Sequence, residues 1–184
     1  MRISVTILQY EHGIIRQVLD VLAEVIRSER TEACSKEVKE ILHFLYEFGD
    51  RFHNTKEEGL FFPVVLEEFP DFTEKVESIL VEHRLIRALF EDSIHALDDK
   101  NWNLLDETGL ILVKHMIALV ENEENHLFPT IDEFLSFDID ECLNQSYSQF
   151  LSRFGEDYHQ KAELFANDIQ DRLLGPGFFN QGIY

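Results

Sequence analysis

Apolar residues recur every three or four positions along most of the chain, and this spacing limits the possible folds more than any other feature. The first such stripe consists of Leu8, His12, Ile15, Leu19, Leu22 and Ile26. Four more stripes of the same period run through 38–60, 76–97, 105–126 and 143–169. With only 8 glycines and 4 prolines in 184 residues, the chain lacks the turn signals of a β-protein. The sequence therefore predicts an all-α protein built from five helices.

The breaks between the stripes are short and fall at 28–35, 69–72, 98–101 and 136–140. Short connections make successive helices antiparallel neighbours, so the first four are expected to form an up-down-up-down four-helix bundle over residues 1–135. Residues 136–174 are expected to form an additional helix that packs on the bundle or in the interface of a homo-oligomer. Residues 175–184, which begin Gly-Pro-Gly, are predicted to be an irregular tail.

The balance of charges argues against several classes of partner. The 16 basic and 36 acidic residues give a net charge of −20, which repels phosphate backbones and anionic lipids. We therefore expect no nucleic-acid binding and no membrane binding. Cys34 and Cys142 are far apart and match neither a disulfide framework nor a thiolate metal site. The first residues lack the pattern of a signal peptide, and a cytoplasmic location is expected.

Two motifs occur twice, in the same order. Glu-His begins a helical stripe at residues 11–12 and again at 82–83, an offset of 71. Glu-Glu followed, after three intervening residues, by Phe-Pro begins at residue 57 and again at 123, an offset of 66. Two related hairpins in one bundle place repeated inner residues around a common axis. His12, His83, Glu57 and Glu123 are therefore expected to meet in the bundle centre.

These residues favour a metal site, because an ionised carboxylate in an apolar stripe costs several kcal/mol unless a partner offsets it. His53 and Glu57 lie one helical turn apart, so their side chains point the same way and can share a metal. Imidazole and carboxylate ligands without thiolate suit iron, manganese or zinc. The paired Phe-Pro motifs are expected to close one end of the bundle.

The combined motifs resemble those of the hemerythrin-like, or HHE cation-binding, domain over about residues 1–135. This resemblance implies a non-haem di-iron centre with an oxo or hydroxo bridge and an open position for dioxygen or a related diatomic molecule such as nitric oxide. It also implies that Glu57 and Glu123 bridge the two ions. The implied ligands are His12, His53, Glu57, His83 and Glu123.

Two positions depart from the family pattern. The fourth helix of the family usually carries a histidine four residues before its glutamate, where this chain has Leu119. Oxygen-carrying members also have a second histidine where this chain has Arg87. His126, three residues after Glu123, is the first predicted substitute ligand and His115 is the second, unless a π-bulge resets the phase of the helix. The missing ligands make simple oxygen storage a less favoured function.

The favoured function is the binding or sensing of dioxygen, nitric oxide or iron at this centre. The alternatives are a di-iron enzyme acting on peroxide, oxygen or nitric oxide, and an interaction module whose metal site has degenerated. Other polar residues are expected to have structural roles. Glu58 and Glu124 are expected to face outward or to support the ligands. Surface ion pairs or packing are expected for Arg16, Arg87, His43, His95 and His159.

Overall fold

The computed structural model describes residues 2–176, and the four bundle helices begin and end close to the predicted breaks. The first is α1 (Ile3–Arg27) and the third is α4 (Thr73–Asp98), which follows a short 3₁₀ turn, η3 (Pro70–Phe72). The second and fourth bundle helices each change pitch along their length. The second consists of α2 (Ser35–Phe44), η1 (Leu45–Asn54), η2 (Glu57–Phe61) and α3 (Phe62–Glu68). The fourth consists of α5 (Trp102–Asn122), η4 (Glu123–Leu127) and α6 (Phe128–Phe134).

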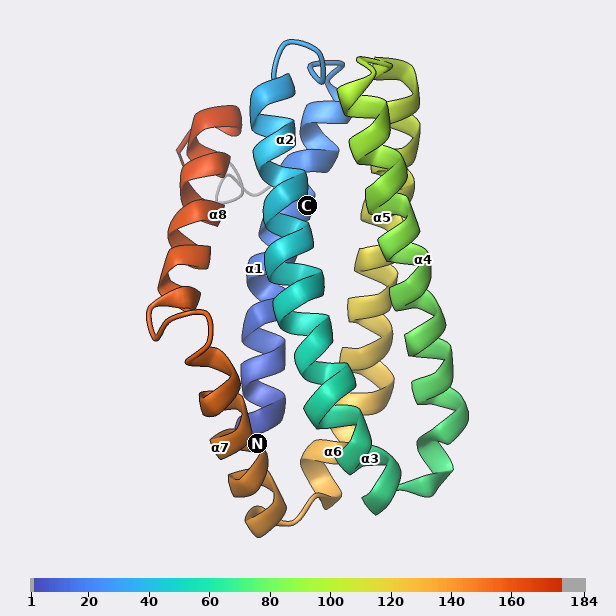
Figure 1. Ribbon diagram of the computed structural model, residues 1–184, viewed down its shortest axis with the longest axis vertical. Helices are drawn as coiled ribbons and strands as arrows, with labels where there is room; N and C mark the ends of the chain where they lie inside the picture. Colours follow the sequence, from blue (N-terminus) through green and yellow to red (C-terminus); the bar gives the residue numbers. More distant parts are fainter. Residues whose placement is uncertain (1, 177–184) are drawn as a thin grey trace.

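The four long helices run antiparallel to their neighbours in a bundle, which confirms the predicted fold class (Figure 1). α1 packs against α5 and η1, while α4 packs against α5, α2 and η1. Residues 2–176 contain no β-strand. In the same range, no helix combines the length and the hydropathy that a membrane span requires.

The C-terminal segment differs from the single helix that the sequence predicted. It forms α7 (Phe137–Leu151) and α8 (Tyr158–Leu174), and the two are separated by a turn in which Gly155 has a φ of +109°. A left-handed φ is accessible to glycine without strain, so the chain can change direction at this residue. Both helices lie along α1, on the side away from α4 and α5 (Figure 1). Of the predicted tail, residues 177–184 lie outside the described part of the chain.

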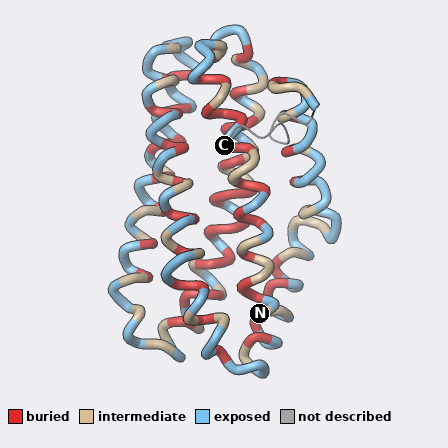
Figure 2. The backbone as a smooth tube through the Cα atoms, turned by 180° about the vertical axis from the view of Figure 1, so that it is seen from behind, coloured by how far each residue is buried: buried red, intermediate tan, exposed pale blue. Residues whose placement is uncertain are grey.

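α1 is covered on most of its circumference, and Figure 2 shows the buried positions following the inner faces of the helices. α5 and η1 cover one side of α1, and α7 and α8 cover the other. Asp140 of α7 also caps α1, because its carboxylate accepts hydrogen bonds from the backbone N–H groups of Ile3 and Ser4 at 2.9 and 3.0 Å. These bonds satisfy N–H groups that the start of a helix otherwise leaves unpaired.

η2 and η4 are π-helical turns that occupy equivalent places in the two hairpins. In η2 the N–H of Phe62 bonds the carbonyl of Glu57, and in η4 the N–H of Phe128 bonds the carbonyl of Glu123. Each turn leads into a proline, Pro63 or Pro129, which lacks an N–H and whose ring clashes with a carbonyl four residues earlier. A widened turn before the proline accommodates this clash. Both repeated glutamates therefore begin a π-turn.

Candidate metal centre

Five polar side chains meet inside the bundle, and each is almost completely buried. They come from all four bundle helices and are His12, His53, Glu57, His83 and Glu123. All except His83 place one potential ligand atom within 4.8 Å of the others. The structure therefore brings together the five residues that the repeat and the resemblance indicated.

The two carboxylates face histidines on both of their sides. Oε1 of Glu57 lies 3.5 Å from Nε2 of His53, and Oε2 lies 3.6 Å from Nε2 of His83. Oε2 of Glu123 lies 3.3 Å from Nε2 of His12, and Oε1 lies 3.9 Å from Nε2 of His83. Each glutamate thus offers one oxygen to the side of His12 and His53 and the other to the side of His83.

The atoms that face this centre lack hydrogen bonds to other described residues. They are Nε2 of His12, Nε2 of His83 and all four carboxylate oxygens of Glu57 and Glu123. The His12 to Glu123 contact is short but does not have hydrogen-bond geometry. Buried polar atoms are normally paired, and an unpaired one costs about 1–3 kcal/mol, more if it is charged. Nitrogen and oxygen atoms that converge in this way fit a cation of the iron, manganese or zinc type.

The outer nitrogen of each histidine contacts a carboxylate from a different helix. Nδ1 lies 3.0 Å from Glu124 in His12, 2.7 Å from Glu11 in His53 and 2.8 Å from Glu58 in His83. Since an ionised carboxylate only accepts, each Nδ1 carries the proton in this arrangement and each Nε2 presents its lone pair to the centre. Carboxylates that hold metal-binding histidines in this way fix the ring orientation and the tautomer.

A basic side chain in turn holds each of these carboxylates. Arg16 lies 2.8 Å from Glu124 and Arg87 lies 2.7 Å from Glu58. Burial raises the pKa of Glu58, but His83 and Arg87 outweigh burial and the net pKa is lowered. The prediction that Arg16 and Arg87 form ordinary surface pairs was wrong, because both support histidines of the centre.

Glu11 is the most enclosed of the three supporting carboxylates. It is fully buried and binds Lys56, which is also buried, together with His53 and His159. Burial raises the pKa of Glu11, but Lys56 and the two histidines outweigh it, so the net pKa is lowered and the group is ionised. His159, for which the sequence predicted only a surface or packing role, therefore also contacts the carboxylate that holds His53.

The structure does not bring His126 or His115 into the cluster. His126 is exposed, and His115 is a third exposed with its Nδ1 3.0 Å from Glu82. The prediction for His126 assumed an α-helix after Glu123, in which three residues nearly complete a turn. η4 is wider, so three residues rotate the side chain less and leave it pointing outward. Among the described residues, the His83 side of the centre therefore has one imidazole, and Leu119, at the position where the family usually has a histidine, is buried.

Burial and like charge shape the proton affinities of the metal-free centre. Burial raises the pKa of Glu57 well above its ordinary range, and the neighbouring Glu123 raises it further. Burial lowers the pKa of His12, but Glu123 and Glu124 outweigh burial and the net pKa is raised. Burial, with a smaller contribution from the His12 charge, lowers the pKa of His53 to about 4.

These shifts predict that the metal-free protein loses stability as the pH rises above about 6.5. In this range the folded protein retains protons on Glu57 and His12 that the unfolded chain has released, so the unfolded state binds fewer protons. His53 acts in the opposite direction, but only between its folded pKa of about 4 and its ordinary pKa of 6.5. Melting temperatures of the chelator-treated protein from pH 6.5 to 8.5 should therefore fall. A rise over this range would contradict the assignment.

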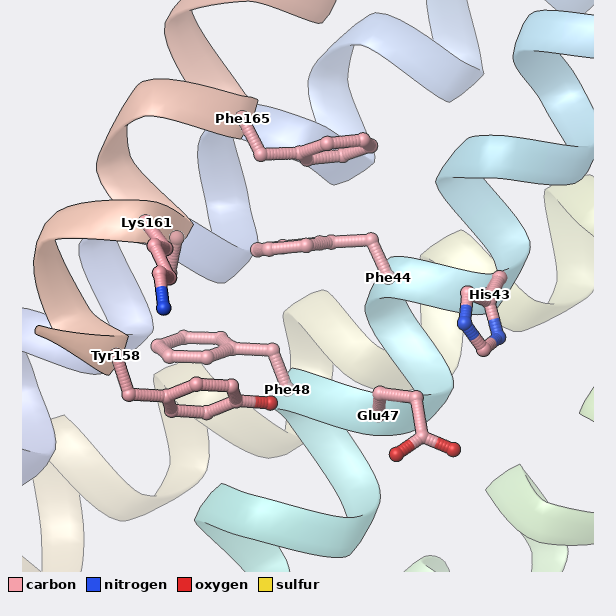
Figure 3. Close-up of a pocket in the computed structure, with 8 residues that line it drawn as sticks. His43, Phe44, Glu47, Phe48, Tyr158, Lys161 and Phe165 are labelled. Atoms are coloured by element: carbon pink, nitrogen blue, oxygen red, sulfur yellow. The ribbon is translucent and has the colours of Figure 1, made fainter. Parts of the chain in front are cut away.

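A separate groove of about 220 Å³ lies between the second bundle helix and α8 (Figure 3). Aromatic rings form much of its wall, and those of Phe44 and Phe165 stack with centroids 4.4 Å apart. Figure 3 also shows Phe48 and Tyr158 side by side, with centroids 5.8 Å apart. None of the five clustered residues lines this groove. Its rings instead attach α8 to α2 and η1.

The comparison with protein families agrees with the geometry. The model of the hemerythrin HHE cation-binding domain matches residues 4–131, which include all five clustered residues. No curated protein and no solved structure matches the chain at a significant level. The family match covers the whole bundle except its extreme ends and excludes α7 and α8. Together with the His/Glu cluster at its centre, this match shows that the chain belongs to the hemerythrin HHE cation-binding family.

Proposed function

We propose that the chain binds two iron ions as a non-haem di-iron centre and that this centre binds or senses a diatomic molecule, dioxygen or nitric oxide. The observation that carries the proposal is the set of unpaired, buried ligand atoms on both sides of Glu57 and Glu123. His12 and His53 would hold one ion and His83 the other, with the two carboxylates shared. An iron pair supplies redox chemistry and open coordination positions, and an oxo or hydroxo group would complete its bridge.

A small cavity lies near the cluster but is not lined by it. Its volume is about 40 Å³, and Lys56, Tyr147 and His159 of its lining surround the Glu11 network. This volume is enough for water or a diatomic molecule but not for a bulky substrate. The buried hydroxyl of Tyr147 has no partner among the described residues and could donate to such a molecule.

Aromatic rings shield the centre on its other side. Phe128 stacks on His12 with centroids 5.5 Å apart, and Phe62 stacks on His83 at 6.1 Å. Both phenylalanines belong to the repeated Phe-Pro motifs and are buried. An apolar wall of this kind keeps bulk water away and strengthens electrostatic interactions inside the site.

Anaerobic reconstitution with ferrous iron tests the metal assignment. We expect two iron ions per chain, with the ion on the His83 side bound more weakly because it has fewer nitrogen ligands. His53→Ala should remove the ion that His12 and His53 share. His126→Ala and His115→Ala are matched controls and should leave the stoichiometry unchanged. If the protein holds fewer than one iron, manganese or zinc ion per chain after this reconstitution, the proposal is refuted.

Exposure of the ferrous protein to gas tests the proposed ligand. A visible absorption band that appears with dioxygen or nitric oxide and disappears when the gas is removed is the expected result. Steady consumption of peroxide, oxygen or nitric oxide in the presence of a reductant would instead identify an enzyme. A melting temperature that is the same with and without metal would indicate an interaction module with a degenerate site.

A further inference from the structure

We infer that His159 of α8 is a positioning residue of the metal centre, which it supports through Glu11 and His53. The inference rests on the proposed metal binding and extends it to a part of the chain outside the family match at residues 4–131. The C-terminal helices would then contribute to metal affinity as well as to packing.

A continuous line of hydrogen bonds joins α8 to a proposed ligand. Nε2 of His159 lies 2.7 Å from Oε1 of Glu11, and Nδ1 of His53 lies 2.7 Å from Oε2 of the same carboxylate. Because the ionised carboxylate can only accept, both histidines donate to it. His159 and Lys56 bind one oxygen and leave the other aligned with His53.

The other two supporting carboxylates show why Glu11 needs a further donor besides Lys56 and His53. Glu58 and Glu124 are 30% and 19% exposed, so water can reach them, and each has an arginine from the family segment. Glu11 is fully buried and receives only Lys56 as a cation from that segment. A buried carboxylate requires several donors to remain ionised and fixed in orientation. The N–H of His159 meets this requirement.

Packing holds the His159 ring in the required orientation. Its centroid lies 5.5 Å from Tyr10, 5.4 Å from Phe52 and 6.4 Å from Phe48, in edge-to-face arrangements. Tyr158, the preceding residue, packs in the aromatic wall visible in Figure 3. The attachment of α8 to the bundle therefore determines where the donor N–H lies.

Titration of the metal-free full-length protein with Co²⁺ tests this role, since visible Co²⁺ bands report coordination geometry as well as occupancy. His159→Phe preserves a ring among the aromatic neighbours but removes the N–H. We expect this substitution to weaken Co²⁺ binding at the His12 and His53 side about tenfold, as loss of a hydrogen-bonding partner behind a metal ligand commonly does. It should also change the shape of the Co²⁺ bands. His159→Gln, which restores an N–H donor, should recover much of the affinity and the spectrum.

Leu173→Ala is the matched control, because Leu173 is buried near the far end of the same helix. It should lower the melting temperature while leaving the dissociation constant and the Co²⁺ spectrum unchanged. If His159→Phe does not fold, His159→Leu provides the same comparison. Normal affinity and spectrum in a folded variant without the N–H would overturn the role of His159 while leaving metal binding intact. Failure of the unsubstituted protein to bind any metal would refute the proposed function itself.

Discussion

Glu57→Gln should abolish the binding of both metal ions and, at the same time, stabilise the metal-free protein. Loss of binding follows because the glutamate faces His53 with one oxygen and His83 with the other, and a neutral amide is a poor replacement for a shared carboxylate. The gain in stability follows because burial, and then the neighbouring Glu123, raise the pKa of Glu57 well above its ordinary range, so that the folded state must keep a proton that the unfolded chain releases. Removing the ionisable group should raise the free energy of unfolding by about 1–3 kcal/mol at pH 8.

Thermal unfolding of the chelator-treated variant and of the unsubstituted protein measures this gain, which should shrink at pH 5 as the free carboxylate of the unfolded state becomes protonated. Glu58→Gln is the matched control, because Glu58 is held by His83 and Arg87 and its net pKa is lowered despite burial. That substitution should destabilise the metal-free protein. If both variants lose stability to the same degree, the buried carboxylate of Glu57 does not destabilise the metal-free protein.

Leu119→His should create a tighter site on the His83 side of the centre. The N–H of Glu123 bonds the carbonyl of Leu119, so these two residues are one α-helical turn apart and share a face. Leu119 is 6% exposed and has a volume similar to that of histidine. Loss of a supporting partner alone commonly changes metal affinity 10–100-fold, so a new direct ligand should increase affinity for the second ion by at least about tenfold.

Metal titration of Leu119→His, read as the separation between two binding steps, measures this change. Leu119→Phe is the control that inserts a ring without a nitrogen, and it should leave the second step weak or weaken it further. If the histidine variant binds the second ion no better than the unsubstituted protein, the side chain at position 119 does not reach the ion. The expected difference in affinity between the two ion sites would then need another cause.

The sequence was sufficient to predict the all-α bundle and the convergence of the His and Glu residues, because both depend on spacing. The helical stripes identify the inner faces, and the duplicated motifs identify which polar residues share them. The π-turns could not be recognised from periodicity, although Pro63 and Pro129 mark their positions. Without those turns, His126 was assigned to the wrong face.

The carboxylates that hold the clustered histidines were harder to predict, because these hydrogen bonds run between helices. Glu11, Glu58 and Glu124 each neighbour a ligand in sequence but hold a histidine on another helix. The repeated spacing of Arg16 and Arg87 was a usable signal, since each follows a duplicated histidine by one turn. No comparable pattern marks His159, whose role depends on the turn at Gly155 and on how α8 packs.

The hydrogen bonds between the histidine of one helix and the glutamate of another also have a kinetic consequence. α1 supplies Glu11 to the second helix, the second helix supplies Glu58 to α4, and the fourth helix supplies Glu124 to α1. The contact between α4 and α5 also has a histidine–carboxylate bond, between His115 and Glu82, but both side chains are about a third exposed and neither belongs to the clustered residues. An ion held between His12 and His53 would therefore be enclosed by three linked helices, and we expect its release to be slow. An ion at His83, which would have one imidazole ligand in place of two, should leave on a shorter timescale.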